Sequence, residues 1–290
     1  MAEISIAGIM RAGAFSPNHI GNDAAIFNMV ADELRKRGYI VNVYSEEQFI
    51  KAGSVSEPVI VNMCRERKSV ALLQKLEDRG KLVINSGYGI ENCTRERMTR
   101  ILLGSDIPYP KSLMVDTNEG VLDQLEKAGI ERAWVKRGDY HAQHKEDVTY
   151  VRHRQEAQEV LQEYFMRGIP RAVINIHLEG DLVKFYGLRN NDFFYWFYPN
   201  QSDKNRREIE AVNGTTGEAK FSVSMLKDIC QKAAEELDVV IYGGDAIVDA
   251  DGTFRIVDFN DWPSFAPCRV LAAPFIAKAI ISEIKKRGAS

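Results

Sequence analysis

Residues 243–265, GGDAIVDADGTFRIVDFNDWPSF, constrain the fold most because they predict a β-hairpin that carries acidic side chains. An Asp-Gly pair stands between two apolar runs, and this is a strong local signal for a two-residue hairpin turn. Side chains two positions apart share one face of a strand, so Asp258 and Asn260 point the same way. Asp245 lies toward the far end of the partner strand, where it can converge with them.

These three side chains offer the oxygen atoms that a hard divalent cation binds. Mg²⁺ usually takes one or two carboxylates and completes its shell with water and substrate phosphates. Acidic residues also end strands and favour turns, and that simpler interpretation suits Asp251. We therefore predict that Asp245, Asp258 and Asn260 are metal ligands for Mg²⁺, with Mn²⁺ as a substitute.

The rest of the chain divides into three units by its apolar pattern. Residues 1–92 alternate short apolar runs with amphipathic stretches, which predicts a parallel sheet flanked by helices. Residues 93–170 mix helices and strands around two prolines, and residues 171–290 are mostly β at first, with 171–198 typical of an antiparallel meander. The predicted fold class is α/β, with α+β units after an N-terminal parallel-sheet domain.

The hairpin resembles that of the ATP-grasp superfamily, in which an acid is followed thirteen residues later by a second acid and then, two residues on, by Asn. Asp245, Asp258 and Asn260 reproduce that spacing, and the resemblance extends over residues 82–270. It implies two lobes that clasp ATP and one or two magnesium ions that bridge its phosphates. The second acid is commonly Glu in that family, and Asp258 is shorter by about 1.5 Å.

Cationic residues for the phosphates come from two segments. INSGYGIENCTRERMTRILLGSDIPYPKSLMV resembles the helix and proline-containing turn that open the family's ATP-binding region, and Arg100 stands there for a phosphate-binding Lys. We expect Arg95 and Arg97 on the same helix to be solvated. Lys136, at a strand end, matches the second phosphate-binding Lys, whereas residues 137–146 hold one glycine where many members have a Gly- and Ser-rich loop.

The segment AVINIHLEGDLVKFYGLR resembles the family's hinge strand and the turn after it. In that family, backbone groups there hold adenine, and an acidic side chain holds ribose. The resemblance assigns the adenine contacts to Asn175, His177 and Leu178, and the ribose contact to Asp181 with Glu179 in reserve.

Two further cations are catalytic candidates. Lys184 and Arg189 follow the hinge, and the resemblance implies that they hold the γ-phosphate or an acyl-phosphate. Each can instead be an exposed charge at a sheet edge. Many carboxylate ligases have an Arg just before the first metal acid, and this chain has Gly243 and Gly244 there.

The resemblance implies an ATP-dependent carboxylate–amine or carboxylate–thiol ligase that forms an acyl-phosphate and releases ADP and phosphate, as glutathione synthetase, ribosomal-protein glutamate ligase and D-alanine ligase relatives do. One alternative is a small-molecule kinase similar to the superfamily's inositol-phosphate kinases. Another is a nucleotide-binding protein without turnover, favoured by Asp258, the glycine-poor loop and the missing Arg. The expected partners are a small carboxylate and a small amine, and a homodimer is the commonest assembly for such a chain.

Rival functions find little support. The formal net charge of -3 gives no global attraction to nucleic acid. Residues 8–13 have the outer glycines of a P-loop but lack the Lys and Ser or Thr that must follow. The first strand is followed by Arg11, Ser16, Asn18 and His19, which form either an anion-binding loop or a plain surface loop.

Composition also bears on location. No apolar run reaches the roughly 20 residues of a spanning helix, so we predict no membrane partner. The four cysteines have no paired spacing, which fits neither a disulfide framework nor a zinc site. A reducing compartment, the cytoplasm, is the expected location.

Overall fold

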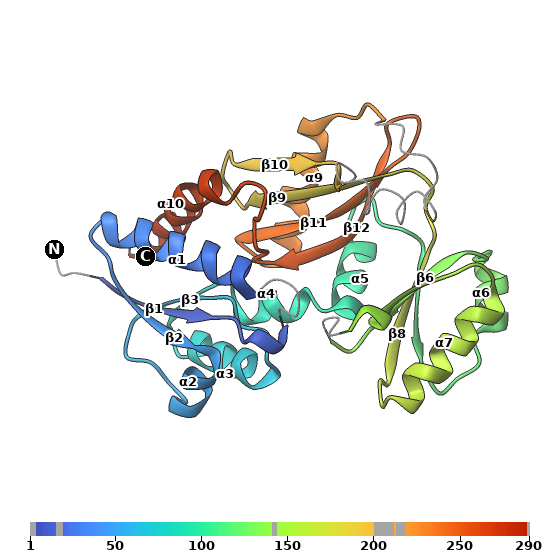
Figure 1. Cartoon of the computed structure of the whole chain (residues 1–290), viewed down its shortest axis with the longest axis horizontal. Helices are drawn as coiled ribbons and strands as arrows, with labels where there is room; N and C mark the ends of the chain where they lie inside the picture. Colours follow the sequence, from blue (N-terminus) through green and yellow to red (C-terminus); the bar gives the residue numbers. More distant parts are fainter. Residues whose placement is uncertain (1–3, 16–19, 141–143, 200–211, 213–218, 289–290) are drawn as a thin grey trace.

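The chain forms three four-stranded sheets, each with helices packed against it (Figure 1). The computed structural model describes residues 4–15, 20–140, 144–199, 212 and 219–288. One sheet is parallel and two are antiparallel. This arrangement confirms the predicted α/β class.

The first sheet is wholly parallel, in the order β2-β1-β3-β4. Its strands are short apolar runs, and β3 is buried along its whole length because helices cover both faces. A capping box at Ser45 and a left-handed Gly53 delimit α2. The elements of this part are β1 (Ser5–Met10), η1 (Gly13–Phe15), α1 (Ile20–Lys36), β2 (Ile40–Ser45), α2 (Glu46–Ala52), β3 (Val59–Asn62), α3 (Arg67–Asp78), β4 (Leu82–Ile84) and α4 (Gly87–Asn92).

The middle sheet is antiparallel, in the order β5-β8-β6-β7. The helices α6 and α7 close its apolar core. Its elements are β5 (Ser112–Asp116), α6 (Leu122–Ala128), β6 (Ala133–Arg137), η2 (Lys145–Asp147), β7 (Val148–Val151), α7 (Arg154–Met166) and β8 (Arg171–Ile176).

The third sheet has the order β10-β9-β11-β12, and the predicted hairpin forms its β11 and β12. Two helices, α5 and α9, cover one face, where Met98 and Leu102 meet Leu226 and Phe185. The elements are α5 (Arg95–Gly104), β9 (Asp181–Leu188), β10 (Phe194–Phe197), α9 (Val223–Glu236), β11 (Ile241–Val248), β12 (Phe254–Asp261) and α10 (Arg269–Gly288).

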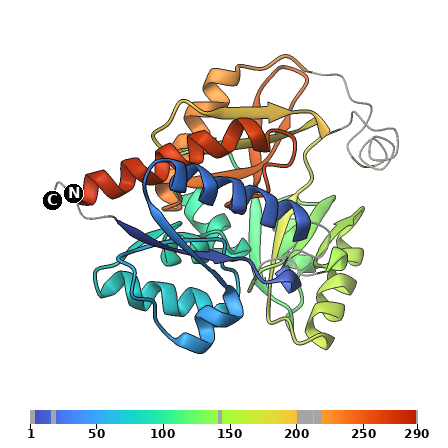
Figure 2. The same ribbon diagram turned by 60° about the vertical axis from the view of Figure 1, so that its left-hand side comes forward.

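The spatial units differ from the predicted sequence units in three places. Strand β8 pairs with β5 and β6, so the meander predicted over residues 171–198 is wrong and the middle sheet ends at Ile176. Helix α5, predicted in the middle unit, packs in the core of the third sheet. Helix α10 lies against α1 in the core of the first sheet, as both views show (Figures 1 and 2).

Asn85 joins the first sheet to the third. Its side chain is buried, and its Oδ1 accepts hydrogen bonds from the Val240 and Ile241 amides at 2.8 and 2.9 Å. Its Nδ2 donates to the Ile241 carbonyl at 2.8 Å. One amide side chain therefore satisfies three backbone groups at the start of β11, which places the hairpin relative to the first domain.

Cys64, Cys93, Cys230 and Cys268 are all free and buried. Burial raises the pKa of the Cys230 thiol well above its usual range. In the part of the chain that the structure describes, no helix is both long and apolar enough to cross a membrane.

Candidate functional site

A cavity of about 280 Å³ lies between the middle and third sheets. Strands β6 and β8 form one wall, β11 and β12 form the other, and α5 contributes Arg95. The polar lining residues are Arg95, Lys136, Asn175, Asp245 and Asp258; apolar ones include Trp134, Leu178, Ile247 and Val257. Apolar walls with a few convergent charged groups are typical of a ligand site.

The hairpin brings the predicted metal residues together. Asp245 and Asp258 are direct partners across β11 and β12, and both line the cavity. Asn260 lies two residues beyond Asp258, and its side chain helps to lower the pKa of that carboxylate. A break in register between Asp245 and Ala246 shifts the strands locally, as β-bulges near functional sites do.

Arg95 is the strongest partner of Asp258, and the expectation that it is solvated is wrong. Its Nη1 donates to Asp258 Oδ1 at 2.6 Å, and only 13% of its side chain is exposed. Burial alone would raise the pKa of Asp258, but the positive charges of Arg95 and Lys136 outweigh it and lower that pKa to about 2.

Arg100, the predicted phosphate-binding residue, does not line this cavity. It pairs with Glu96 at 2.8 Å, and 65% of its side chain is exposed. Five residues separate it from Arg95, which rotates it by about 140° around the helix. One sequence signal could have identified Arg95 as a candidate phosphate ligand. It is the first residue of α5, and helix N-termini are common anion sites.

Lys136 lies in β6 as predicted and is 7% exposed. Its Nζ donates to the Val257 carbonyl at 3.1 Å, across the gap between the two sheets. Burial, followed by the charge of Arg95, lowers the pKa of Lys136 to about 7, against the opposing effect of Asp258 and Asp245. The amine is therefore close to half-protonated at neutral pH, and a bound anion would restore its charge.

Lys184 lies opposite Asp245 on β9, and its Nζ contacts Asp245 Oδ1 at 2.8 Å. The Asp245 carboxylate raises the pKa of Lys184. Arg189 does not join this group: it pairs with Asp238 at 3.0 Å, at the other end of β9. Five residues of extended strand separate Lys184 from Arg189 by about 16 Å, and residues an odd number apart on a strand point to opposite faces.

Two of the three predicted adenine residues, Asn175 and Leu178, line the cavity. Asn175 is 2% exposed; its Nδ2 donates to Ser112 Oγ at 2.6 Å, and its Oδ1 has no hydrogen-bond partner among the described residues. A buried acceptor of this kind suits a ligand donor. His177 lies behind the wall, where Trp134 Nε1 donates to its Nδ1 at 3.3 Å.

Neither predicted ribose carboxylate lines the cavity. Asp181 is 6% exposed, and its Oδ2 accepts from the Ala219 amide at 2.7 Å, so it ties β9 to the segment before α9. Glu179 is exposed and pairs with Arg132 at 2.6 Å. The structure thus places both beside the hinge rather than in the site.

The donor set around the hairpin fits Mg²⁺ when phosphates complete it. Across the described ranges, no three His, Cys, Asp or Glu side chains lie close enough to hold a metal by themselves. Asp245, Asp258 and Asn260 still offer two carboxylates and an amide oxygen on adjacent strands, which is the usual protein share of a magnesium–nucleotide site. Both carboxylates also contact cations, so the metal would share them with Lys184 and Arg95.

Arg11 is a buried structural residue rather than part of an open anion loop. It donates to Asp23 Oδ2 at 2.9 Å and to the Trp262 carbonyl at 3.0 Å, which ties the first domain to the end of β12. Ser16, Asn18 and His19, predicted beside it, lie outside the described residues.

No protein-family model and no curated sequence matches the chain. Solved structures do match over nearly its whole length. The D-alanine–D-alanine ligase of Bacillus anthracis, complexed with ATP, has a TM-score of 0.68 at 14% identity and covers 99% of both chains. The D-alanine–D-alanine ligase from Coxiella burnetii has a TM-score of 0.70 at 12% identity and covers 99% of this chain and 97% of that one.

A third similar structure is the ATP-grasp ligase PsnB, complexed with minimal precursor. Its TM-score is 0.60 at 17% identity, and the match covers 97% of this chain and 99% of PsnB. At such low identity the likeness concerns the path of the backbone, and residue roles must come from the site itself. Since these matches cover 97 to 99% of this chain, which includes all three sheets, the chain has the ATP-grasp fold.

Proposed function

We propose that the chain is an ATP-dependent ligase that joins a small carboxylate to an amine or a thiol. One observation supports the proposal most strongly. The cavity between the middle and third sheets is lined by two cations and two carboxylates, namely Arg95, Lys136, Asp245 and Asp258. These residues come from three parts of the sequence, and cations facing paired carboxylates suit a metal–triphosphate ligand.

The proposed chemistry balances in two steps. A carboxylate oxygen of the substrate attacks the γ-phosphorus of ATP, the bond to the β,γ-bridging oxygen breaks, and ADP leaves. The amine nitrogen then attacks the acyl carbon, and the bond between that carbon and the oxygen that bridges to phosphorus breaks. Phosphate leaves with this oxygen and the bonding electron pair, and the nitrogen loses a proton. No protein nucleophile is needed, so the chain's residues bind, orient and neutralise.

Each cation has a proposed task. Arg95 and Lys136, which both line the cavity, hold the phosphates of ATP. We assign to Lys184, which contacts Asp245, the task of holding the transferred phosphoryl group. Asp245, Asp258 and Asn260 hold magnesium, which when bound neutralises phosphate charge.

A second candidate, a nucleotide-binding protein without turnover, is favoured by one observation. The position two residues before Asp245 is Gly243, and a Cβ there would meet Pro263 and Tyr186 at 2.7 Å. No larger residue fits without a shift, so no side chain at this position can stabilise a transferred phosphoryl group. Lys184 must supply that charge for turnover to occur.

The test measures ADP and phosphate formed from Mg-ATP with pools of amino acids, dipeptides and small dicarboxylates. Asp258→Asn is compared with Asp251→Asn, an isosteric change in the exposed hairpin turn. Equal amounts of ADP and phosphate that need two co-substrates, and that vanish only in Asp258→Asn, would establish the ligase. ADP with a phosphorylated acceptor and no free phosphate would instead indicate a kinase, and ATP binding without turnover favours the second candidate.

A further inference from the structure

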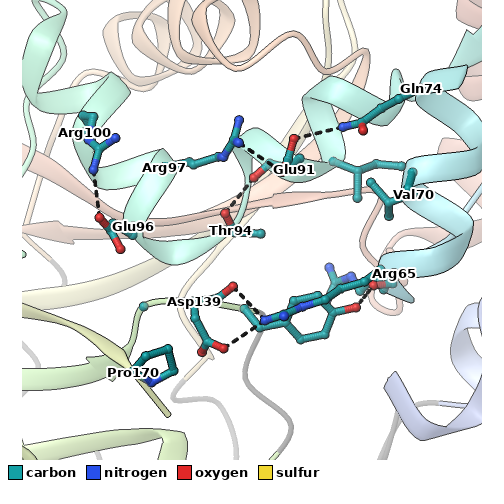
Figure 3. A pocket seen from close by; sticks show the side chains of 15 residues that line it. Arg65, Val70, Gln74, Glu91, Thr94, Glu96, Arg97, Arg100, Asp139 and Pro170 are labelled. Carbon is teal, nitrogen blue, oxygen red and sulfur yellow. Dashed lines mark hydrogen bonds and ion pairs between the residues drawn. The ribbon is translucent and has the colours of Figure 1, made fainter. Parts of the chain in front are cut away.

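A second and larger cavity, of about 560 Å³, lies between the helices of the first domain and the part of the chain that forms the middle sheet (Figure 3). Helices α3, α4 and α5 and the segment 138–140 line it, and it shares no lining residue with the cavity described above. Its volume falls in the range of about 300 to 1,000 Å³ that is usual for small-molecule sites. Nothing in the proposed ligase chemistry uses it.

Arginine is the dominant polar residue of this cavity. Among the described residues, four arginines and three acids line it, and these give an excess of one positive charge. Figure 3 shows Arg97 and Arg100 along one side, with Asp139 and Pro170 across from them. The three arginines that are most exposed each contact one lining carboxylate: Arg67 with Asp139 at 2.9 Å, Arg97 with Glu91 at 3.1 Å, and Arg100 with Glu96 at 2.8 Å.

Two of these carboxylates are shared with arginines from outside the lining. Asp139 also accepts from Arg137 at 2.7 Å, and Glu96 also accepts from Arg171 at 3.0 Å. Each of these two carboxylates therefore interacts with two arginines at once. Arg67 and Arg100 are thus less fully neutralised than a one-to-one pairing would make them.

These arginines can accept a ligand at little cost. Side-chain exposures of 66%, 52% and 65% for Arg67, Arg97 and Arg100 place their pairs in the class of exposed ion pairs, whose stabilisation is small. A guanidinium carries five N–H donors, and within the described residues each of the three binds a carboxylate through one nitrogen only. The remaining donors match a carboxylate or phosphate in a bidentate geometry.

The cavity also has an apolar wall. Val70, Ile90 and Pro170 line it, and the Arg67 guanidinium lies 4.9 Å from the centre of the Tyr140 ring. Hydrated inorganic ions gain nothing from such a wall, whereas a carbon frame does.

We propose that this cavity binds a small organic anion, with a carboxylate or phosphate group held by Arg67, Arg97 and Arg100 and its carbon frame on the apolar wall. The elements that line this cavity also carry, or directly follow, residues of the cavity between the middle and third sheets. Helix α5 gives Arg95 to one cavity and Arg97 to the other, and the segment 138–140 directly follows β6 with Lys136. Helix α5 and the junction between β6 and the segment 138–140 therefore connect the two cavities directly.

The test is calorimetric binding to the full chain without ATP. Citrate and N-acetylglutamate serve as carboxylate probes, glycerol 3-phosphate and phosphoserine as phosphate probes, and glucose as a neutral probe. We expect at least one anionic probe to bind with a Kd of about 1 mM or tighter, and glucose not to bind. The class that binds identifies which acid group the arginines select.

Variants locate the binding. Arg97→Gln with Arg100→Gln should weaken the probe by at least about tenfold. Arg35→Gln, which removes a comparable exposed i,i+3 pair on α1, should leave it unchanged. Arg97→Lys retains the positive charge, so its binding shows whether loss of charge or a general effect of substitution weakens the probe. Thermal unfolding of each variant checks that it is folded.

Three outcomes overturn the inference. They are no binding of any anionic probe, equal binding by wild type and the double variant, and simple competition by saturating Mg-ATP, which would mean that the probe occupies the first cavity. None of them bears on whether ADP and phosphate form from two co-substrates, so the proposed ligase is tested separately.

Discussion

The low pKa of Lys136 makes binding of Mg-ATP depend on protons. Burial and Arg95 hold this pKa at about 7 in the free protein, so near pH 8 only about a tenth of the amine is charged. A triphosphate in the cavity adds negative charge next to Lys136 and moves its pKa back toward the ordinary value of 10.5. Binding near pH 8 should therefore take up about 0.9 proton, and near pH 6 about 0.1.

The rise in the pKa of Lys136 on binding also determines how the affinity for Mg-ATP changes with pH. Since binding takes up a proton above the free pKa of about 7, the affinity for Mg-ATP should fall with rising pH there, by up to about tenfold per pH unit. The free protein behaves in the opposite way. Its unfolded chain binds more protons than the folded one between pH 7 and 10.5, so this residue's penalty to folding stability shrinks as pH rises through that window.

The assay is titration calorimetry in buffers of different ionisation enthalpy, where the slope of observed enthalpy gives the protons taken up. Lys136→Met removes the titrating amine and reports the contribution of ATP itself, while Lys227→Met on α9 is a control for loss of a distant Lys. The difference between wild type and Lys136→Met is the predicted uptake. An equal slope for both proteins near pH 8 would refute the reasoning.

Three further changes test the site and the fold. Arg95→Gln should weaken Mg-ATP binding by about tenfold or more while Arg100→Gln leaves it nearly unchanged, as measured by titration, and the reverse order would contradict the placement of the two arginines. Asn85→Ala leaves buried backbone groups without partners and should lower the free energy of unfolding by about 2 to 4 kcal/mol in urea, whereas a loss below about 0.5 would mean that water replaces the amide. Gly187→Ala would push a methyl group into the Tyr242 ring and should lower the free energy of unfolding by about 1 to 3 kcal/mol, with unchanged stability as the contrary result.

The hairpin with its acids could be predicted because its signals are local. A two-residue turn and a period of two determine which side chains share a face, and these features need no knowledge of the rest of the chain. Asp245 and Asp258 therefore lie where the sequence indicated. The choice between Arg95 and Arg100 depended instead on the phase of a helix against a sheet more than 150 residues away, which no local pattern reveals.

The hinge illustrates the same limit. Asp181 was predicted to face a ligand because it follows the hinge strand, but a backbone amide 38 residues later takes its carboxylate. Asn85 had no sequence signal at all, since its three backbone partners lie in Val240 and Ile241, at the start of β11 and more than 150 residues away. Side chains whose partners are local can be predicted from sequence, and those that join distant segments need the three-dimensional structure.

The position of α10 has a consequence for synthesis on the ribosome. Ile276, Ile280 and Ile284 of α10 complete the core that Ile6 and Ile26 begin, so part of this apolar core, beside α1, stays uncovered until residues 269–288 have emerged. Domains usually fold in the order in which they are made, at about 5 to 20 residues per second. Here β1 and α1 are made long before the helix that completes their core, and the nascent chain must stay unaggregated with part of that core exposed while the residues between them are made.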